Sequence, residues 1–292
     1  MSGTLYLCAT PIGNLGDMTA RCIDTLKEAD LIAAEDTRGT IRLLNHFDIH
    51  TPMTSYHEHN KYEKADELVS VLLQGKSIAL VTDAGTPGIS DPGEVLVQKC
   101  MENDIPVTSL PGCCALISAL ILSGLSTGRF CFEGFLPPDK KEREEILSEL
   151  SSETRTILLY EAPHRLLKTL GILKEKLDPR KITLCRELTK KFEEILPFST
   201  IGEAECYFDV NEPRGEFVLV IEGKDRRELL DEKRTAYETM TVEDHVRHYL
   251  ELGMDRKEAM RQAAKDRGVP KREIYQALLG TKDEAGALKD EA

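Results

Sequence analysis

Seven short clusters of glycine, proline and polar residues each follow a short apolar run in this sequence. The longest is TDAGTPGISDPG at 82–93, where three glycines and two prolines follow the apolar run IALV. Ligands of open α/β sheets bind in this position, at the carboxyl ends of the strands. The other clusters are PIGN (11–14), EDTR (35–38), PGCCA (111–115), YEAPHR (160–165), CRELTK (185–190) and RGEF (214–217).

The glycines of the 82–93 loop fit neither familiar phosphate-binding pattern. Gly85-x-x-Gly88 is not G-x-G-x-x-G, and no Lys-Ser/Thr pair follows it as in a Walker loop. The loop therefore predicts a cradle for a ligand other than a nucleoside polyphosphate.

The polar clusters also contain groups that can move a proton or bind an anion. Five side chains are candidates for proton transfer: Asp36, Asp83, Glu161, Glu187 and His164. Arginines are better suited to holding phosphate than to moving protons, and the clusters contain Arg38, Arg165 and Arg186. The pair His57 and His59 has no third ligand at a suitable spacing, which favours RNA contact or helix capping over a metal site.

The elements that must position these clusters alternate between β-rich runs and amphipathic stretches. This alternation predicts an α/β fold built from parallel βαβ units. The stretch 136–145 has two prolines followed by densely charged residues, which is typical of a linker and the start of a helix. We expect an N-terminal α/β domain with the ligand loop at 1–136 and a second α/β domain closing the cleft at 137–224, followed by a charged linker and helical module at 225–292.

The last part of the chain has a specific helical pattern. KDRRELLDEKR (224–234) is expected to be a solvated connector. Asp255-x-x-Glu258 resembles a capping box, and Gly268 ends that helix before a third one begins. Helices joined by a glycine turn form a helix-turn-helix pattern, and the segment 255–272 has seven Lys or Arg against three Asp or Glu. A nucleic-acid contact and a purely structural helical bundle both fit.

Composition narrows the class of protein. The net charge of −13 argues against a protein that coats nucleic acid through bulk charge, although it allows a local basic patch. None of the eight cysteines forms a C-x-x-C pair, which favours reduced, buried thiols over a zinc cluster or disulfide framework. With no membrane-length apolar stretch and no signal-like N-terminus, we expect a cytoplasmic protein.

Seven motifs together resemble, in order and spacing, the tetrapyrrole methylase superfamily, and most closely its branch that modifies ribosomal RNA. They are PIGN, AAEDTR, TDAGTPGISDPG, FEGFLP, YEAPHRL, RELTK and RGEFVLVIEG, and they cover residues 3–223. The resemblance implies two α/β/α domains with S-adenosylmethionine between them and a helical C-terminal module. It also implies 2′-O-methylation of a cytidine in 16S rRNA, with the rRNA or the small ribosomal subunit as partner, in an enzyme that is usually a homodimer.

The resemblance assigns residues to two groups. The cofactor side would comprise Pro11, Gly13, Asp83, Gly85, Thr86, Pro87, Gly88, Ile89, Cys114, Ala115, Tyr160, Gly215 and Glu216. The acceptor side would comprise Asp36, Arg38, Glu161, Arg165 and Arg186. A sulfonium cofactor without phosphates has no use for a lysine in its loop, which agrees with the unusual glycine pattern. One departure is Cys113, which stands where the branch usually has proline or alanine; because its side chain is small, cofactor binding is expected to survive.

Two other functions compete with this hypothesis. One is C-methylation of a tetrapyrrole intermediate, the activity that names the superfamily. The other is a non-catalytic RNA-binding or assembly factor that kept the fold. The basic helical tail and the arginine-bearing motifs favour RNA over a free macrocycle, and the intact glycine loop disfavours a non-catalytic protein.

Overall fold

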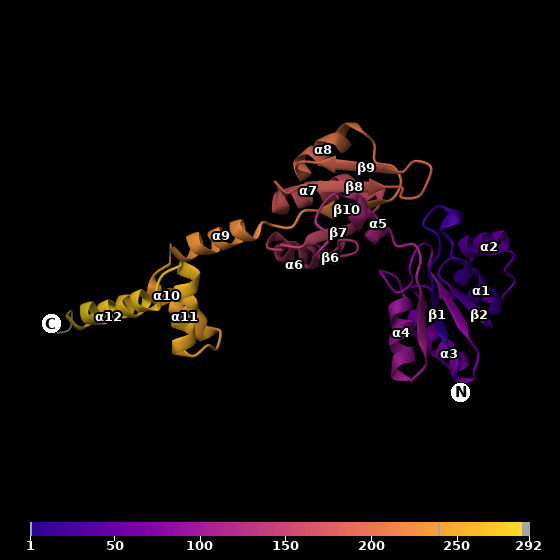
Figure 1. The fold of residues 1–292 in the computed structure, drawn as a ribbon, viewed down its shortest axis with the longest axis horizontal. Coiled ribbons are helices and arrows are strands. Elements are labelled where there is room, and N and C mark those ends of the chain that lie inside the picture. Colours follow the sequence, from indigo (N-terminus) through magenta and orange to yellow (C-terminus); the bar gives the residue numbers. More distant parts are fainter. Residues whose placement is uncertain (1, 239, 288–292) are drawn as a thin grey trace. The chain divides into compact units, whose positions relative to one another are not determined.

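The computed structural model describes residues 2–238 and 240–287, and the chain divides into two compact units, 1–223 and 224–292 (Figure 1). Residues 288–292, the end of the predicted helical module, lie outside the described residues. Among the helices that are described, none combines the length and apolar character that a membrane crossing requires. The predicted three-part division at 136 and 224 stays a prediction.

The first sheet is entirely parallel, with strand order β3-β2-β4-β1-β5. Its strands are β1 (Leu5–Cys8), β2 (Leu31–Ala34), β3 (Met53–Ser55), β4 (Ile78–Val81) and β5 (Val107–Leu110). The connecting helices are η1 (Leu15–Asp17), α1 (Ala20–Glu28), α2 (Thr37–His46), α3 (Lys61–Leu73) and α4 (Gly93–Glu102). Every residue of β4 is buried, as expected for a central parallel strand that is covered on both faces.

Two hydrophobic clusters account for the two covered faces. One contains Leu68 and Leu72 of α3 with Leu96 of α4. The other contains Leu26 of α1 and Leu44 of α2. The first sheet is therefore the middle layer of an α/β/α sandwich, and the polar clusters after β1, β2 and β4 meet at its carboxyl edge.

The second sheet is mixed, with strand order β6-β7-β10-β8-β9. Its strands are β6 (Phe130–Phe132), β7 (Thr156–Glu161), β8 (Ile182–Arg186), β9 (Glu194–Phe198) and β10 (Phe217–Ile221), with helices α5 (Ala115–Leu122), α6 (Lys140–Ser151), α7 (Pro163–Leu177) and α8 (Ile201–Val210). Only β6 and β7 run parallel, whereas β10 lies between β7 and β8 and is antiparallel to both. This differs from the expected parallel βαβ units, because β8 and β9 form a hairpin that reverses the chain.

Helices cover both faces of the second sheet as well. Leu147, Leu170 and Phe208, from α6, α7 and α8, belong to one buried cluster. Leu116 and Leu120 of α5 belong to the cluster on the other face, and Figure 1 shows α5 beside β10. The predicted fold class is therefore confirmed.

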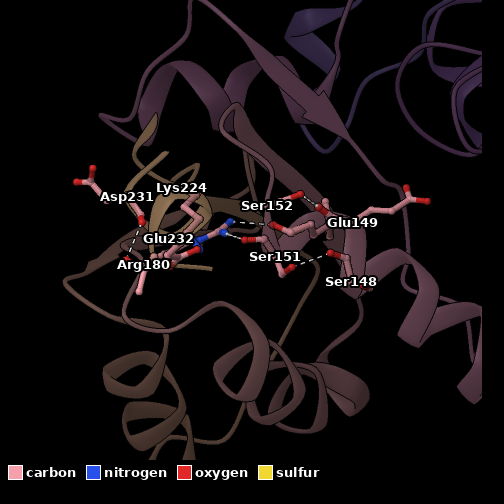
Figure 2. Close-up of polar contacts among 10 residues, drawn as sticks. Ser148, Glu149, Ser151, Ser152, Arg180, Lys224, Asp231 and Glu232 are labelled. Atoms are coloured by element: carbon pink, nitrogen blue, oxygen red, sulfur yellow. Dashed lines mark hydrogen bonds and ion pairs between the residues drawn. The ribbon is translucent and has the colours of Figure 1, made fainter. Parts of the chain in front are cut away.

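The C-terminal end of α6 is joined to the segment before β8 through one arginine. Arg180 donates from Nη1 to the carbonyl of Leu150 at 3.1 Å. It also donates from Nη2 to the carbonyl of Ser151 at 2.6 Å, a contact drawn in Figure 2. The last carbonyls of a helix have no partner within the helix, and a cation there also interacts favourably with the helix dipole. The contact therefore helps to hold α6 on its layer.

The described residues of the second unit form four helices: α9 (Arg226–Glu238), α10 (Val242–Glu251), α11 (Arg256–Arg267) and α12 (Lys271–Ala287). The segment expected to be a connector is thus helical in α9. The capping signal is confirmed, since the Asp255 side chain accepts from the Glu258 amide at 2.8 Å. Gly268 ends α11 with φ +67°, a conformation that favours glycine.

The core of this second unit contains a polar network around His245. The imidazole stacks on the Tyr237 ring at 3.9 Å, and its Nδ1 accepts from Arg267 Nε at 3.0 Å. Burial, together with the positive charge of Arg267, lowers the pKa of His245 below its ordinary value. The residue therefore packs as a neutral ring, with the tautomer that leaves Nδ1 free to accept.

Candidate functional site

The glycine loop after β4 is paired with the end of β1 through its backbone. The amide of Thr10 donates to the Gly85 carbonyl (2.9 Å) and the amide of Gly85 donates back to the Thr10 carbonyl (3.0 Å). Gly85 has φ +85°, and a Cβ there would lie 3.3 Å from Ile12 Cγ2 and 3.4 Å from the carbonyl oxygen of Cys113. Glycine is thus favoured by the backbone conformation, and any Cβ there would be tightly packed.

The rest of the loop is shaped by a carboxylate that our sequence predictions missed. Asp91 accepts from the amides of Gly88 (2.8 and 2.9 Å), Ile89 (3.2 Å) and Gly93 (2.8 Å). These bonds hold Gly88 at φ +88° and Ser90 at φ +60°. The available signal was an aspartate two residues before a helix start, a position where such side chains commonly bind backbone amides.

The open side of this loop offers room and no cations. A Cβ built on Gly88 meets nothing within 4 Å, so the backbone there faces free space. Residues 82–93 include no Lys, Arg or His. The loop can therefore approach a ligand closely through its backbone, without supplying a counter-ion for phosphate.

The other side of the loop joins the start of α5. Thr86 Oγ1 donates to the Cys113 carbonyl at 2.9 Å. This contact is made by the backbone of residue 113, so it does not depend on the cysteine side chain that replaces the family's usual proline or alanine. Cys114, Ala115 and Tyr160 pack in one apolar cluster with Ile12. Burial raises the pKa of Tyr160 to about 12, and its hydroxyl stays protonated at neutral pH.

Lys190 links the PIGN loop to the second sheet. Its Nζ lies 2.9 Å from both Glu187 Oε1 and Glu216 Oε2, and its stem lies against Gly13, where a Cβ would be 2.3 Å from Lys190 Cγ. Gly215 is crowded in the same way by Glu187. Sequence reasoning placed Gly13, Gly215 and Glu216 here but missed Lys190, although it lies in the RELTK motif.

The electrostatics of this ion-pair cluster favour the charged forms. Burial alone would lower the pKa of Lys190, but Glu187 and Glu216 outweigh that effect and raise it. Burial alone would raise the pKa of Glu187, but hydrogen bonds from Lys190 and from the Glu216 amide lower it. Glu187 is thereby hydrogen-bonded within the protein, and its lowered pKa makes it a weak base for a substrate proton.

A cavity of about 480 Å³ lies at the carboxyl ends of β1, β2 and β4. The Asp36 amide donates to Asp83 Oδ1 at 2.9 Å, and Asp36 Oδ1 caps α2 by accepting from the Arg38 amide at 2.9 Å. The hydrogen bond from this amide lowers the pKa of Asp36. The structure therefore brings the following predicted residues to one cavity: Pro11, Gly13, Asp36 and Asp83.

The remaining predicted acceptor residues bind protein groups. Glu161 is 2% exposed and accepts from Thr169 Oγ1 (2.5 Å) and the Ala162 amide (2.8 Å). Arg165 lies 3.3 Å from Glu161 and donates to the Leu136 carbonyl at 2.6 Å. Arg186 is paired with Glu194 at 2.6 Å. These contacts suit side chains that position the edge of the second sheet, and their roles in chemistry stay predictions.

The histidine pair of the 57–59 segment lies close together without a third ligand in the described residues. His57 and His59 have ring centroids 6.0 Å apart, and the His57 amide donates to Asn60 Oδ1 at 2.8 Å. Within the described ranges 2–238 and 240–287, no group of three His, Cys, Asp or Glu could hold a metal ion.

Comparison with known proteins places this arrangement in a family. The model of the Tetrapyrrole (Corrin/Porphyrin) Methylases matches residues 4–205. The chain belongs to this family. Among tetrapyrrole methylase relatives, a protein from Synechocystis named Ribosomal RNA small subunit methyltransferase I is 50% identical over 278 residues, which are 95% of this chain and 98% of the relative. One of the same name from Bacillus subtilis is 49% identical over 275 residues, 94% of each chain.

A solved structure supports the family's fold at lower identity. Uroporphyrin-III C-methyltransferase from Thermus thermophilus, complexed with S-adenyl homocysteine, matches 75% of this chain and 92% of its own with a TM-score of 0.54. The identity is 18%, so the likeness concerns the fold alone.

The amides bound by Asp91 predict a measurable role for this residue. Asp91→Asn should lower the free energy of unfolding by about 2 kcal/mol, because an amide NH2 would replace one of the oxygens that accept backbone N–H groups. Urea unfolding followed by circular dichroism measures this. Asp24→Asn on the exposed face of α1 is the matched control and should change stability by less than about 0.5 kcal/mol. Equal stability of the two variants would contradict the role of Asp91.

Proposed function

We propose that this protein is an S-adenosylmethionine-dependent methyltransferase of small-subunit (16S) ribosomal RNA that methylates the 2′-hydroxyl of a cytidine. The observation that carries the proposal is the similarity to proteins named Ribosomal RNA small subunit methyltransferase I. Two of them are 50% and 49% identical to this chain over 95% and 94% of its length. The cation-free glycine loop beside a cavity with two carboxylates is consistent with it.

The residues around the loop fit S-adenosylmethionine. Gly88 leaves space for a ligand against the backbone, and the loop has no cation to repel a sulfonium. We assign binding to the loop (Gly85, Thr86, Pro87, Gly88, Ile89), to Pro11, Gly13 and Asp83, to Cys114, Ala115 and Tyr160, and to Gly215 and Glu216. When bound, this cofactor supplies a methyl group on positively charged sulfur, and the sulfur keeps the electron pair of the broken C–S bond.

The chain's own contribution is to orient the ribose and accept its proton. Asp36 borders the cavity beside Asp83, and its carboxylate can accept a hydrogen bond from a hydroxyl of the acceptor. We assign Arg38 to a phosphate of the acceptor strand, and Glu161, Arg165 and Arg186 to positioning. Alignment of the acceptor supplies much of the rate, because the reaction is an in-line displacement.

The first prediction for this proposal concerns cofactor binding. Gly88→Val should raise the Kd for S-adenosylmethionine at least tenfold, because a β-branched residue is strained at φ +88° and its side chain fills the ligand's space. Isothermal titration calorimetry measures the change. The matched control is Gly253→Val in the second unit, where φ is +86° and a Cβ also meets nothing. If both folded variants bind equally well, the loop assignment is wrong.

The second prediction concerns the product. The protein, 16S rRNA and methyl-labelled S-adenosylmethionine should yield RNA in which alkaline hydrolysis leaves one protected dinucleotide, since cleavage needs the free 2′-hydroxyl. Gly88→Val protein serves as the negative control. Label recovered on a base would contradict ribose methylation, and transfer to uroporphyrinogen but not to rRNA would favour the tetrapyrrole alternative.

We also propose that the enzyme is a homodimer and that α5 contributes to the interface. This helix has no charged residue, and opposite its buried face it exposes Ile117 (40%), Ile121 (68%) and Leu122 (47%). An apolar helix face of this kind is unfavourable in water unless another surface covers it. A second copy of the chain would cover this face of α5 in each protomer.

The dimer has a direct test by light scattering. The wild-type protein should have twice the chain mass of 32.7 kDa, and Ile121→Asp should shift the population to the monomer mass. Met101→Asp, at another exposed apolar side chain (67%) on α4, is the control and should leave the mass unchanged. A wild-type monomer, or a dimer insensitive to Ile121→Asp, would contradict the proposed interface.

A further inference from the structure

Helix α2 has an unusual charge for this acidic protein. It contains Arg38, Arg42 and His46 but no Asp or Glu. Every other α-helix of the described residues that has a basic residue also has an acidic one, and the whole chain has a net charge of −13. Positive charge is therefore concentrated on α2, a helix that covers the first sheet.

The two arginines lie on one exposed face of the helix. They are four residues apart, so their side chains emerge about 6 Å from each other. The Arg38 side chain is 92% exposed and Arg42 is exposed, while Thr40 and Leu44 bury the opposite face. This spacing is comparable to that of neighbouring phosphates on a nucleic-acid strand.

Neither guanidinium is neutralised by a close partner. Arg38 Nε is 3.6 Å from Asp36 Oδ1 in an exposed pair, which screening makes weak. Within the part of the chain that the structure describes, Arg42 forms no ion pair. The planar donors of both side chains can therefore bind an anion from solvent.

The cationic face of α2 adjoins the cavity in which Asp36, assigned to the acceptor, lies with Pro11, Gly13 and Asp83, assigned to the cofactor. Arg42 and Gly39 line this cavity together with Asp36, at the first turns of α2. Thr10 lines it too, and Thr10 is paired with Gly85 of the cofactor loop. A strand bound along α2 would thus pass beside the place where a methyl group is delivered.

We propose that α2 holds the backbone of the RNA strand that contains the acceptor nucleoside, with Arg42 and Arg38 binding successive phosphates and the nucleoside entering the cavity. This inference rests on the proposed function and names the surface through which the substrate is bound. Phosphate contacts fix the register of the strand, and the cavity selects the nucleoside. The charge of α2 is complementary to RNA, and the cavity of about 480 Å³ falls in the size range of ligand sites.

The test measures binding of fluorescently labelled 16S rRNA at several salt concentrations. The double variant Arg38→Gln/Arg42→Gln should bind about tenfold more weakly at fixed salt. The slope of log K against log salt should become shallower by about 1.4, the value for two phosphate contacts to a single strand. Lys27→Gln removes one charge from the last turn of α1, near the amino end of the sheet, and serves as the control with unchanged affinity.

Two further measurements separate the outcomes. Arg38→Lys/Arg42→Lys keeps both charges and should retain the wild-type slope, and all variants should bind S-adenosylmethionine with the wild-type Kd. Unchanged RNA affinity and slope in the glutamine variant would overturn the inference while methyl transfer by the wild type upholds the function. Loss of affinity for assembled small subunits but not for naked rRNA would instead indicate a protein partner on α2. Absence of methyl transfer by the wild type would overturn the function itself.

Discussion

The mutual backbone pairing of Thr10 with Gly85 is the constraint on which the site depends. It joins the ends of β1 and β4, two adjacent central strands, across a residue that only glycine occupies without strain. Because Thr10 also lines the cavity and Gly85 begins the cofactor loop, the pairing sets the two sites side by side. Asp91 then fixes the remainder of the loop through three amides. The backbone can face a ligand only because its own polar groups are satisfied elsewhere.

A second constraint joins the two sheets near this loop. Lys190 forms ion pairs with Glu187 and Glu216 of the second sheet's edge while its stem covers Gly13 of the PIGN loop. Partly buried charges of this kind are stable only when all partners are in place, since removing one leaves the others uncompensated. The tight glycines at Gly13 and Gly215 follow from the same packing, because a Cβ at either would overlap these side chains.

Burial decides which polar residues remain able to contact a substrate. Asp36 and Asp83 remain at the cavity, whereas Glu161 is enclosed and bound by Thr169 and the Ala162 amide. A buried carboxylate that already accepts several hydrogen bonds has little capacity left for a substrate. Charge is also distributed unevenly, since the protein is acidic overall but has two exposed arginines, Arg38 and Arg42, on α2. Electrostatic attraction for RNA can thus be local without being general.

The sequence by itself determined the fold class, the strand-end positions of the polar motifs and the capping of α11, because periodicity, turn residues and caps are local properties. It also determined that the loop would lack a phosphate-binding pattern. Only the tertiary structure decided that β10 pairs antiparallel between β7 and β8, that Lys190 holds the PIGN loop, and that Glu161 is buried. Strand order and side-chain partners depend on residues distant in the chain, as Gly13 and Lys190 are, and no local pattern encodes which of them will meet.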